Sequence, residues 1–330
     1  MKAICCPQYG KPDVLKLVDT KMPTPKEDEV LIEVHAASIN SYDDRIMQGK
    51  PFLVRLREGL WRPRGGKKIL GADIAGKVEA VGKSVTSLAV GDRVYGCLAD
   101  TSGDSGFAEY ACAKASVLAP MPEGFSFEQA AALPMAAVTA LQGLRDMGRI
   151  KPGQKVLING ASGGVGTFAV QIAKAFGAEV TGVCSGRNTA MVRAIGADTV
   201  IDYTKEDFIQ RNEQYDLILD IAANRSLTEY RQALKPDGVC AVVGFSSIGF
   251  LIRLMLFGQK STKKDGKKLA LVMADNTKRQ DLIFLNELFE AGKLTPIIDG
   301  CYPLVETKKA FEYFEKEHAK GKVVLMINEH

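Results

Sequence analysis

The stretch KVLINGASGGVGTFAVQIAKAFGAEVTGVCSGR, residues 155–187, decides the fold of this chain. A short apolar run at 156–158 leads straight into a turn of small residues at 160–166. An apolar-periodic stretch follows at 168–176, and a second apolar run at 180–183 closes the unit. The pattern predicts strand, glycine turn, helix and strand, which is one βαβ unit of the length that a dinucleotide site needs.

The turn is the candidate phosphate-binding element. It comprises Ala161, Ser162, Gly163, Gly164, Val165 and Gly166. The usual fingerprint begins with glycine where Ala161 stands here. Gly163 lets backbone approach a pyrophosphate, and Gly166 lets the helix pack closely on the strand. The start of the helix offers N–H groups to the phosphates. The alternative interpretation is a tight strand-to-helix turn that binds no ligand.

The end of the second strand favours NADP(H) over NAD. An NAD site usually carries Asp or Glu about 20 residues after the glycine turn, where it binds the ribose hydroxyls. Here no carboxylate occurs between Glu179 and Asp198. Arg187 and the hydroxyl of Ser185 are suited to a 2′-phosphate, which an acid would repel. The alternative for Arg187 is a solvated cation at the start of a helix.

Composition sets the class of protein. The chain has 330 residues, enough for two domains, and its 46% hydrophobic and 25% charged content is ordinary for a globular protein. A net charge of +4 is too small to argue for nucleic-acid binding. Seven cysteines without paired spacing indicate reduced thiols, and the N-terminus lacks the apolar core of a signal peptide. These features predict a cytoplasmic location.

Residues 1–122 are predicted to form a barrel-like all-β domain. Apolar and polar residues alternate at 30–36, and further short strands are expected at 77–81 and 93–95, with glycine turns between them. The proline-containing segment 119–122 marks the boundary to the next domain.

Residues 123–291 are predicted to form a doubly wound parallel sheet. Alanine-rich helices come first, at 127–133 and 137–147. Strands and helices then alternate at 155–159, 167–176, 179–183, 188–195, 198–201, 205–212, 216–220, 226–234 and 238–243. The pair 268–273 and 277–291 is expected to supply the sixth strand and helix. Residues 292–330, with an amphipathic helix at 305–317, are predicted to rejoin the first domain.

The chain resembles the medium-chain dehydrogenase/reductase superfamily, and within it the zinc-free quinone oxidoreductase branch. The resemblance covers essentially the whole chain. It rests on 37–43 (ASINSYD), 71–76 (GADIAG), 91–94 (GDRV), the turn at 161–166 and 321–325 (GKVVL). It implies an α/β protein in which a GroES-like β-barrel catalytic domain and a Rossmann NADP-binding domain border a cleft.

The resemblance also bears on metal content. Zinc-dependent relatives carry cysteine where Asn40 stands and histidine where Ala72 stands. Ala72 cannot bind a metal, and a neutral amide is a poor substitute for a thiolate. The family's four-cysteine lobe would fall at 97–110, which contains only Cys97. We therefore expect neither catalytic nor structural zinc.

Candidate catalytic groups follow from the resemblance. The polar residues expected to face the cleft are Asn40, Tyr42 and Asp43, with Thr139 reaching from the nucleotide domain. Tyr42 stands where zinc-dependent relatives have a proton-relay hydroxyl, and its alternative role is aromatic packing. The alternative for Asp43 is a structural one, in which it binds backbone near Asn40.

The resemblance places further cofactor contacts after the later strands. Tyr203 is expected near the adenosine phosphate, Gly244 and Phe245 near the nicotinamide ribose, and Asn224 near the ribose or the pyrophosphate. The alternative for Tyr203 is a core aromatic at the end of a strand.

Two stretches concentrate positive charge. Residues 55–68 and 253–268 each carry six cations against one acid, and the second stretch overlaps the apolar run 250–257. One interpretation is a pair of solvated loops. Another is a basic rim that steers an anionic cofactor or touches an anionic membrane surface. The segment 250–268 is also interpreted as a substrate-pocket cover, a subunit interface or a peripheral membrane contact.

Together these features predict an NADPH-dependent, zinc-independent oxidoreductase that transfers hydride to a quinone or an α,β-unsaturated carbonyl compound. Such conjugated acceptors spread the developing charge, so the protein mainly has to orient the reactants. The alternatives are an enoyl-thioester reductase and a non-catalytic NADPH-binding or redox-sensing protein. We expect a homodimer.

Overall fold

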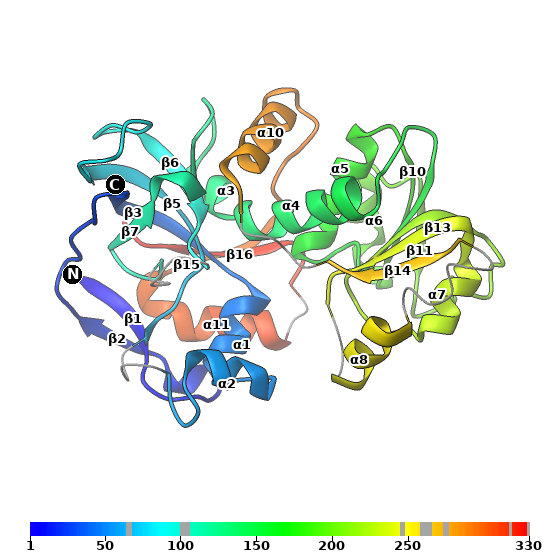
Figure 1. Cartoon of the computed structure of the whole chain (residues 1–330), viewed down its shortest axis with the longest axis horizontal. Coiled ribbons are helices and arrows are strands. Elements are labelled where there is room, and N and C mark those ends of the chain that lie inside the picture. Colours follow the sequence, from blue (N-terminus) through cyan, green and yellow to red (C-terminus); the bar gives the residue numbers. More distant parts are fainter. Residues whose placement is uncertain are drawn as a thin grey trace. The chain divides into compact units, whose positions relative to one another are not determined.

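The chain divides into two compact units, each described here by itself. The computed structural model describes residues 1–63, 68–99, 106–244, 248–257, 266–272, 277–316 and 319–328. The first unit comprises Met1–Met135, Asn276–Glu287 and Ile298–His330, and the second comprises Ala136–Asp275 and Leu288–Ile297. Figure 1 shows the first unit in blue, cyan and red and the second mostly in green and yellow.

The first unit is built on two sheets. Its strands are β1 (Lys2–Cys6), β2 (Lys16–Asp19), β3 (Glu29–Ile39), β4 (Lys68–Ile69), β5 (Asp73–Val81), β6 (Arg93–Cys97), β7 (Tyr110–Lys114), β8 (Leu118–Pro120), β15 (Ile298–Pro303) and β16 (Lys322–Met326). The small sheet has the order β2-β1-β4, and the large one β15-β16-β3-β5-β6-β8, with β7 paired to β3. The strand β16 therefore lies inside the large sheet, and Ile298–His330 groups with the first unit.

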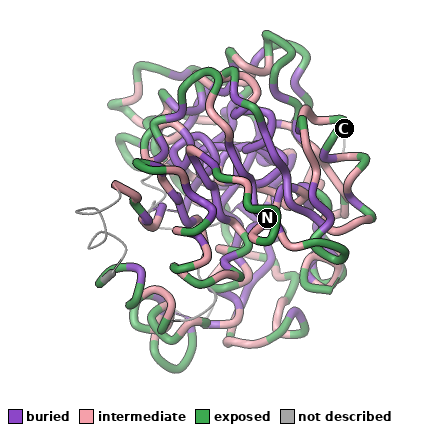
Figure 2. Tube along the Cα trace, turned by 90° about the vertical axis from the view of Figure 1, so that its right-hand side faces the viewer, coloured by how far each residue is buried: buried purple, intermediate pink, exposed green. Residues whose placement is uncertain are grey.

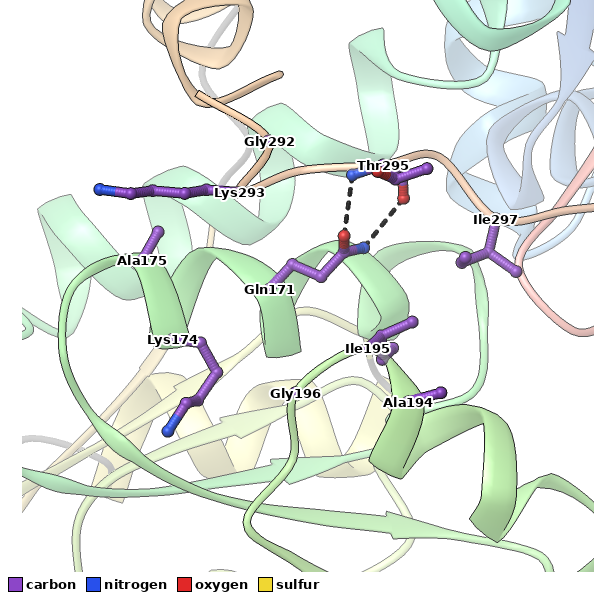
Figure 3. Close-up of a pocket in the computed structure, with 10 residues that line it drawn as sticks. All are labelled: Gln171, Lys174, Ala175, Ala194, Ile195, Gly196, Gly292, Lys293, Thr295 and Ile297. Carbon is purple, nitrogen blue, oxygen red and sulfur yellow. Dashed lines mark hydrogen bonds between the residues drawn. The ribbon is translucent and has the colours of Figure 1, made fainter. Parts of the chain in front are cut away.

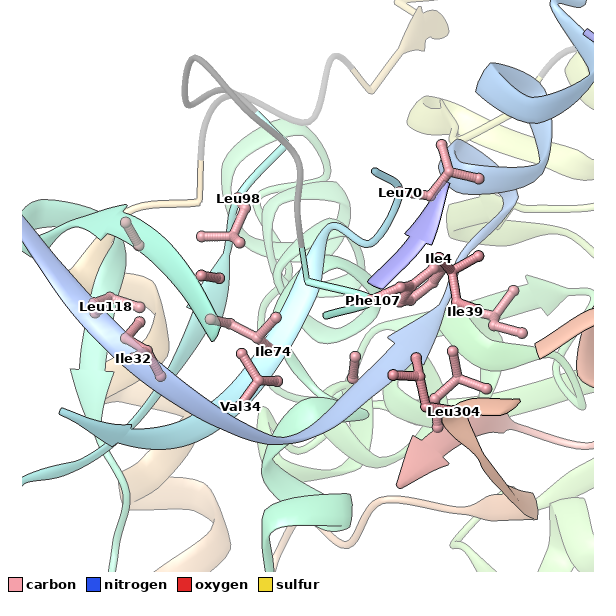
Figure 4. Close-up of a cluster of buried hydrophobic side chains, with 14 of the residues drawn as sticks. Ile4, Ile32, Val34, Ile39, Leu70, Ile74, Leu98, Phe107, Leu118 and Leu304 are labelled. Carbon is pink, nitrogen blue, oxygen red and sulfur yellow. The ribbon is translucent and has the colours of Figure 1, made fainter. Parts of the chain in front are cut away.

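Apolar side chains from both sheets form the core of this unit. Figure 4 shows Ile32, Ile74 and Phe107 among them. The strand β3 is buried at nearly every position, as expected of a strand with neighbours on both edges and side chains packed on both faces. Figure 2 shows the buried residues gathered in the interior of the trace and the exposed residues on its outer loops.

Short helices and turns complete the first unit. They are α1 (Ser41–Gln48), α2 (Phe52–Glu58), α3 (Phe127–Ala131) and α11 (Thr307–Lys316), with 3₁₀ turns η1 (Pro12–Val14), η3 (Ala115–Val117) and η6 (Leu304–Glu306). A capping box starts α3, because Ser126 and Gln129 exchange side-chain-to-backbone hydrogen bonds.

The second unit holds a six-stranded sheet in which every pairing is parallel. Its strands are β9 (Lys155–Asn159), β10 (Glu179–Cys184), β11 (Thr199–Asp202), β12 (Tyr215–Asp220), β13 (Leu234–Val242) and β14 (Lys268–Leu271), in the order β11-β10-β9-β12-β13-β14. This is the doubly wound order, and β14 is the predicted sixth strand.

Helices connect these strands. They are η4 (a π-helix, Gln142–Met147), α5 (Gly164–Ala175), η5 (3₁₀, Gly186–Asn188), α6 (Thr189–Ala194), α7 (Leu227–Ala233) and α8 (Ile248–Phe257). The boundary between the units falls within two further helices, α4 (Pro134–Leu141) and α10 (Arg279–Glu290).

The units do not divide at the positions proposed from sequence, 122 and 291. Residues 123–135 group with the first unit because α3 packs on β3 and β5. The first part of α10 does so as well, since the Tyr95 hydroxyl donates to the carbonyl of Leu282 (3.1 Å) and to Asn286 Oδ1 (2.6 Å).

The helix predicted at 205–212 is wrong, because this segment is a series of turns. Asp202 Oδ1 accepts hydrogen bonds from the backbone and hydroxyl of Thr204, and Asp207 Oδ1 accepts from the N–H of Ile209. Such local side-chain-to-backbone bonds compete with helix formation.

Among the described residues, no helix is both long enough and apolar enough to cross a membrane.

Candidate functional site

The glycine turn leads from β9 into α5 and explains why alanine is tolerated at its first fingerprint position. The backbone conformation that favours glycine falls one residue earlier, at Gly160, with φ of 93°. Ala161 has no positive φ, is fully buried, and donates its N–H to the carbonyl of Val183 at 2.9 Å. The tight turn therefore belongs to Gly160, and Ala161 anchors it to β10.

Gly163 and Gly166, the two fingerprint glycines of the turn, differ in the space around them. A Cβ added to Gly166 would lie 2.1 Å from the carbonyl oxygen of Gly160, so only glycine allows α5 to sit this close to the turn. A Cβ added to Gly163 would meet only that same oxygen, at 3.7 Å. Gly163 is also the N-cap of α5 and provides no side-chain cap. The first N–H groups of the helix are thus accessible to an anion.

A second loop, η5, lies against this turn. Asn188 Nδ2 donates to Ser162 Oγ at 3.0 Å and links the end of β10 to the turn. Asn188 is buried, and its Oδ1 has no hydrogen-bond partner among the described residues. Ser185 is the N-cap of η5, and Arg187 is exposed. The structure therefore brings Ser162, Ser185 and Arg187 to one end of the sheet.

Asp202 is a carboxylate that sequence reasoning missed at this loop. A Cβ on Gly186 would lie 2.5 Å from Asp202 Oδ2, so the carboxylate lies directly behind the backbone of the loop. The hydrogen bond from the Thr204 hydroxyl holds the pKa of Asp202 below its usual range, which keeps the group ionised. The next residue, Tyr203, is 56% exposed, which excludes the core-aromatic interpretation.

The C-terminal ends of β9 and β12 carry a polar cluster. Asn159 Nδ2 donates to Asp220 Oδ1 at 2.9 Å and to Asn224 Oδ1 at 3.0 Å. Burial raises the pKa of Asp220. Asn224, a predicted cofactor contact, is exposed on this edge. Gly244 follows β13 at the same edge of the sheet, and Phe245 lies outside the described residues.

The predicted catalytic residues lie in the first unit, around a buried ion pair. Asp73 and Lys322 are 0% and 3% exposed, and Lys322 Nζ lies 3.8 Å from Asp73 Oδ2. Asn40 joins them, because its Nδ2 donates to Asp73 Oδ2 at 3.0 Å and its Oδ1 accepts from Lys322 Nζ. Both ends of the Asn40 amide are therefore engaged within the protein.

Asp73 receives several further donors. Ser38 Oγ donates to it at 3.3 Å, and the N–H of Met135, in the first turn of α4, donates to both carboxylate oxygens. Burial raises the pKa of Asp73 and lowers that of Lys322, and the attraction between the two charges opposes both shifts. The pair lies in an interior that has little water to replace a lost partner.

Asp43 holds this region in place. Its Oδ1 accepts from the N–H groups of Gly71 (3.2 Å) and Ala72 (3.1 Å), and its Oδ2 accepts from the N–H of Asn40 (2.9 Å). These hydrogen bonds are the ones expected if Asp43 has a structural role and binds backbone near Asn40.

Tyr42 lies beside the same network, half-buried. Its hydroxyl donates to the carbonyl of Ala99 at 3.0 Å, and its ring packs with Ala72, Cys97 and Ala99. Thr139, the other predicted contact, is buried on α4 and belongs to the second unit.

A pocket of about 480 Å³ lies in the second unit, away from the glycine turn. It is bordered by the C-terminal half of α5, the end of α6 and the segment 292–297, as Figure 3 shows. The side chain of Gln171 clamps Thr295 there through two hydrogen bonds, 3.0 and 2.8 Å long. None of the predicted site residues lines this pocket.

The described side chains of the types that bind metals do not gather into a metal site. Among the described residues, no cluster of three or more His, Cys, Asp or Glu side chains could hold a metal ion. Where the resemblance implied metal ligands, Asn40 is bound to Asp73 and Lys322. The absence of zinc itself stays a prediction.

Fold and site together define a two-domain α/β protein with a Rossmann-type dinucleotide turn. Residues 26–123 match the family described as alcohol dehydrogenase GroES-like domain, and residues 195–325 match the family described as zinc-binding dehydrogenase. Both the GroES-like domain and the Rossmann sheet are thereby confirmed.

Known relatives identify the superfamily. Human quinone oxidoreductase is 31% identical over 99% of this chain and 98% of its own length. The quinone oxidoreductase structure from Coxiella burnetii is 33% identical with a TM-score of 0.88 and covers 99% of both chains. The Escherichia coli quinone oxidoreductase, solved in complex with NADPH, is 26% identical with a TM-score of 0.83 and covers 99% of this chain and 100% of its own. The chain belongs to the medium-chain dehydrogenase/reductase superfamily. It is an enzyme of the oxidoreductase class, whose family binds a nicotinamide cofactor.

Proposed function

We propose that this enzyme is an NADPH-dependent, zinc-independent reductase of quinones or α,β-unsaturated carbonyl compounds. The observation that carries the proposal is the open space over Gly163 at the uncapped start of α5. Accessible N–H groups there are suited to a pyrophosphate. The quinone oxidoreductase relatives support the class of acceptor.

The residues around the turn would hold the dinucleotide. The turn 161–166 would bind the pyrophosphate, and Asn224, Gly244 and Phe245 would border the ribose and nicotinamide end. The buried Oδ1 of Asn188 is an acceptor that a ribose hydroxyl would satisfy. When bound, NADPH supplies the hydride for the reaction.

The preference for NADPH rests on Arg187 and Ser185, with Tyr203 exposed beside them. Asp202 disfavours a bound 2′-phosphate, because its ionised carboxylate lies behind the same loop. The Thr204 hydrogen bonds hold that carboxylate on the inner side of the loop, so the guanidinium is the group that would meet a 2′-phosphate.

The acceptor chemistry follows from the donor set of the first unit. The Asn40 amide is hydrogen-bonded to a carboxylate and an ammonium, which makes it a poor metal ligand. Without a metal as Lewis acid, the site is not suited to stabilise the alkoxide that forms from an isolated carbonyl group. A conjugated acceptor spreads the charge and requires orientation and a few hydrogen bonds. Tyr42 is the proposed donor to the acceptor oxygen, and Asn40, Asp43 and Asp73 position the segment from which it comes.

The test follows NADPH absorbance with a panel of quinones, enones and an enoyl thioester. Turnover with quinones or enones is expected. Exclusive turnover of the thioester would favour the enoyl reductase alternative, a class represented among the structural neighbours by the CurK enoyl reductase, at 25% identity and TM-score 0.86. No turnover with any compound would favour a non-catalytic NADPH-binding protein.

A matched pair of variants tests the cofactor. Arg187→Ala is expected to weaken NADPH binding about tenfold, since charge-assisted hydrogen bonds contribute roughly 1.5–3 kcal/mol, and to leave NADH binding unchanged. Arg193→Ala, at the far end of α6, is the control. Equal losses for both cofactors in Arg187→Ala would contradict the NADPH assignment.

Two predictions about assembly stay open to measurement. We propose a homodimer, which light scattering on the purified enzyme checks. The segment 250–268 is proposed as a substrate-pocket cover, a subunit interface or a peripheral membrane contact. On α8, Ile252, Met255 and Leu256 are exposed, and residues 258–265 lie outside the described part.

A further inference from the structure

The helix α2 has its apolar side chains on the outside. Phe52, Leu53 and Leu56 are all more than half exposed, and the following loop adds Leu60 and Trp61. Trp61 is 90% exposed and is the only tryptophan of the chain. We call these five residues the α2 surface.

The inner face of the same helix is attached to the first unit through one apolar and one charged side chain. Val54 packs on the core, while Glu58 is buried and accepts from Lys68. The spacing of 54 and 58 is one helical turn, as is that of 52 and 56, so the two pairs occupy different faces. The apolar residues are therefore held outward by the helix geometry.

Contacts on both sides of the helix fix this orientation. The Arg55 guanidinium lies 4.9 Å from the centroid of the Tyr9 ring, and the Tyr9 hydroxyl donates to the carbonyl of Gly59 at 2.6 Å. Arg57 donates to the carbonyl of Ala99 at 3.2 Å. An anchored segment with an apolar outer face is the arrangement of an interaction surface and differs from that of a loose loop.

The charge around the α2 surface identifies the partner. Its described cations are Arg55, Arg57 and Arg62, and the described acid of this segment, Glu58, is buried and paired. Exposed Trp, Phe and Leu side chains flanked by arginine are suited to the headgroup region of an anionic bilayer. We propose that the α2 surface binds anionic lipid membranes peripherally.

The sole tryptophan makes the contact directly observable. The full chain is titrated with vesicles of phosphatidylcholine containing phosphatidylglycerol, and with vesicles of phosphatidylcholine alone. We expect a blue shift of the Trp61 emission and co-sedimentation with the anionic vesicles only, both weakened by salt. An unchanged spectrum and no co-sedimentation would overturn the proposal.

Two triple variants locate the surface. Phe52→Ser/Leu53→Ser/Leu56→Ser keeps Trp61 and is expected to lower vesicle affinity at least tenfold. The matched variant Ile252→Ser/Met255→Ser/Leu256→Ser alters the exposed residues of α8, the other candidate membrane contact of the chain, and is expected to bind as the wild type does because the proposal assigns the contact to α2. All these side chains are exposed, and an unchanged thermal unfolding midpoint checks that each variant is folded. Loss of binding in the α8 variant alone would overturn the proposal.

The charge contribution is tested at Arg62, which is exposed. Arg62→Gln is expected to lower affinity for anionic vesicles about fivefold, because a basic side chain near such a surface contributes roughly 1 kcal/mol. A different outcome is self-association of the wild type without lipid. If the α2 triple variant loses this association and vesicles do not compete with it, the α2 surface binds a second copy of the chain. That outcome would overturn the lipid assignment.

Discussion

Lys322 is a buried charged residue at the start of the strand KVVLM, which is otherwise apolar. Asp73 opens the strand DIAGKVEAV, whose first four positions are buried. Fully buried Lys and Asp side chains almost always have a partner. The sequence therefore contained a signal that these two residues pair, but strand order was needed to join positions so far apart in the chain. β16 and β5 both pair with β3, which brings the two together.

Replacing Lys322 by methionine tests the energetic role of this pair. Lys322→Met leaves Asp73 buried without its cation, so we expect the free energy of unfolding to fall by about 3–5 kcal/mol. Urea unfolding measures the change. Lys16→Met, at an exposed position of β2, is the control and should change little. Asp73→Asn/Lys322→Met should recover part of the loss; a single variant as stable as the wild type would contradict a paired ammonium.

Tyr42→Phe separates chemistry from packing at the proposed donor. The variant keeps the ring against Ala72 and Cys97 and loses only the hydroxyl that now donates to Ala99. Loss of one donor to a developing oxyanion costs on the order of 10²–10³ in rate. We expect kcat with simple enones to fall by about this much, and less with quinones, while NADPH affinity is unchanged. Unchanged kcat with both acceptors would make Tyr42 a packing residue.

Asp202 shows a limit of counting along the sequence. The dinucleotide fingerprint places the acidic residue at the end of β10, whereas Asp202 lies at the end of the neighbouring strand β11. Parallel pairing places Cys184 opposite Asp202, so the carboxylate reaches the Ser185–Arg187 loop from the side. Conversely, the βαβ unit was predictable because its strand, turn and helix are contiguous.

The turn before α5 illustrates how two glycines in one element serve different purposes. Gly166→Ala would drive a methyl group into the Gly160 carbonyl, so we expect a loss of stability of about 1–3 kcal/mol. Gly163→Ala has room for the methyl group in the protein. We therefore expect nearly unchanged stability and at least tenfold weaker NADPH binding. Thermal unfolding and a binding titration on both variants check this; intact NADPH affinity in Gly163→Ala would place the pyrophosphate elsewhere.

The sheet of the second unit is tied at strand ends by two carboxylates. Asp216 accepts from the N–H of Lys155 and from Lys235 Nζ, and Asp198 accepts from the N–H of Val180. Burial raises the pKa of both carboxyl groups. The hydrogen bonds from Lys235 and Lys155 to Asp216, and those from Lys174 and Val180 to Asp198, outweigh burial and lower the pKa overall.

These lowered pKa values predict sensitivity to acid. A carboxylate with a depressed folded-state pKa contributes stability above its unfolded value of about 3.9, and the contribution is lost as the pH falls through the folded-state value. We expect the free energy of unfolding to fall below about pH 5, with a shallower slope in Asp216→Asn. The exposed Asp237→Asn is the control, and identical slopes in wild type and Asp216→Asn would contradict the assignment.

The turns at 205–212 show where periodicity misleads. The spacing of apolar residues there suits a helix, but Asp202 and Asp207 bind nearby backbone donors instead. The crossover between β11 and β12 is consequently made without a helix. An aspartate at the start of a short helical pattern is the sequence feature that indicates turns here.

The metal content of the whole chain is a further prediction. Neither the Asn40 and Ala72 positions nor any described group of three ligand-type side chains suits zinc. Elemental analysis of the purified enzyme should show no stoichiometric zinc, and chelators should leave NADPH oxidation intact. One tightly held zinc per chain, lost together with activity, would contradict the prediction.

The position of β16 inside the large sheet has a consequence for how the molecule is made. On the ribosome, β3 emerges early, but its neighbour β16 and the Lys322 ammonium that Asp73 requires emerge only after the whole second unit. The six strands of the second unit are all synthesised in between. During translation the second unit can therefore form its sheet first. At that stage β3 has an unpaired edge and Asp73 lacks its cation. Completion of the first unit therefore has to follow the synthesis of the whole second unit.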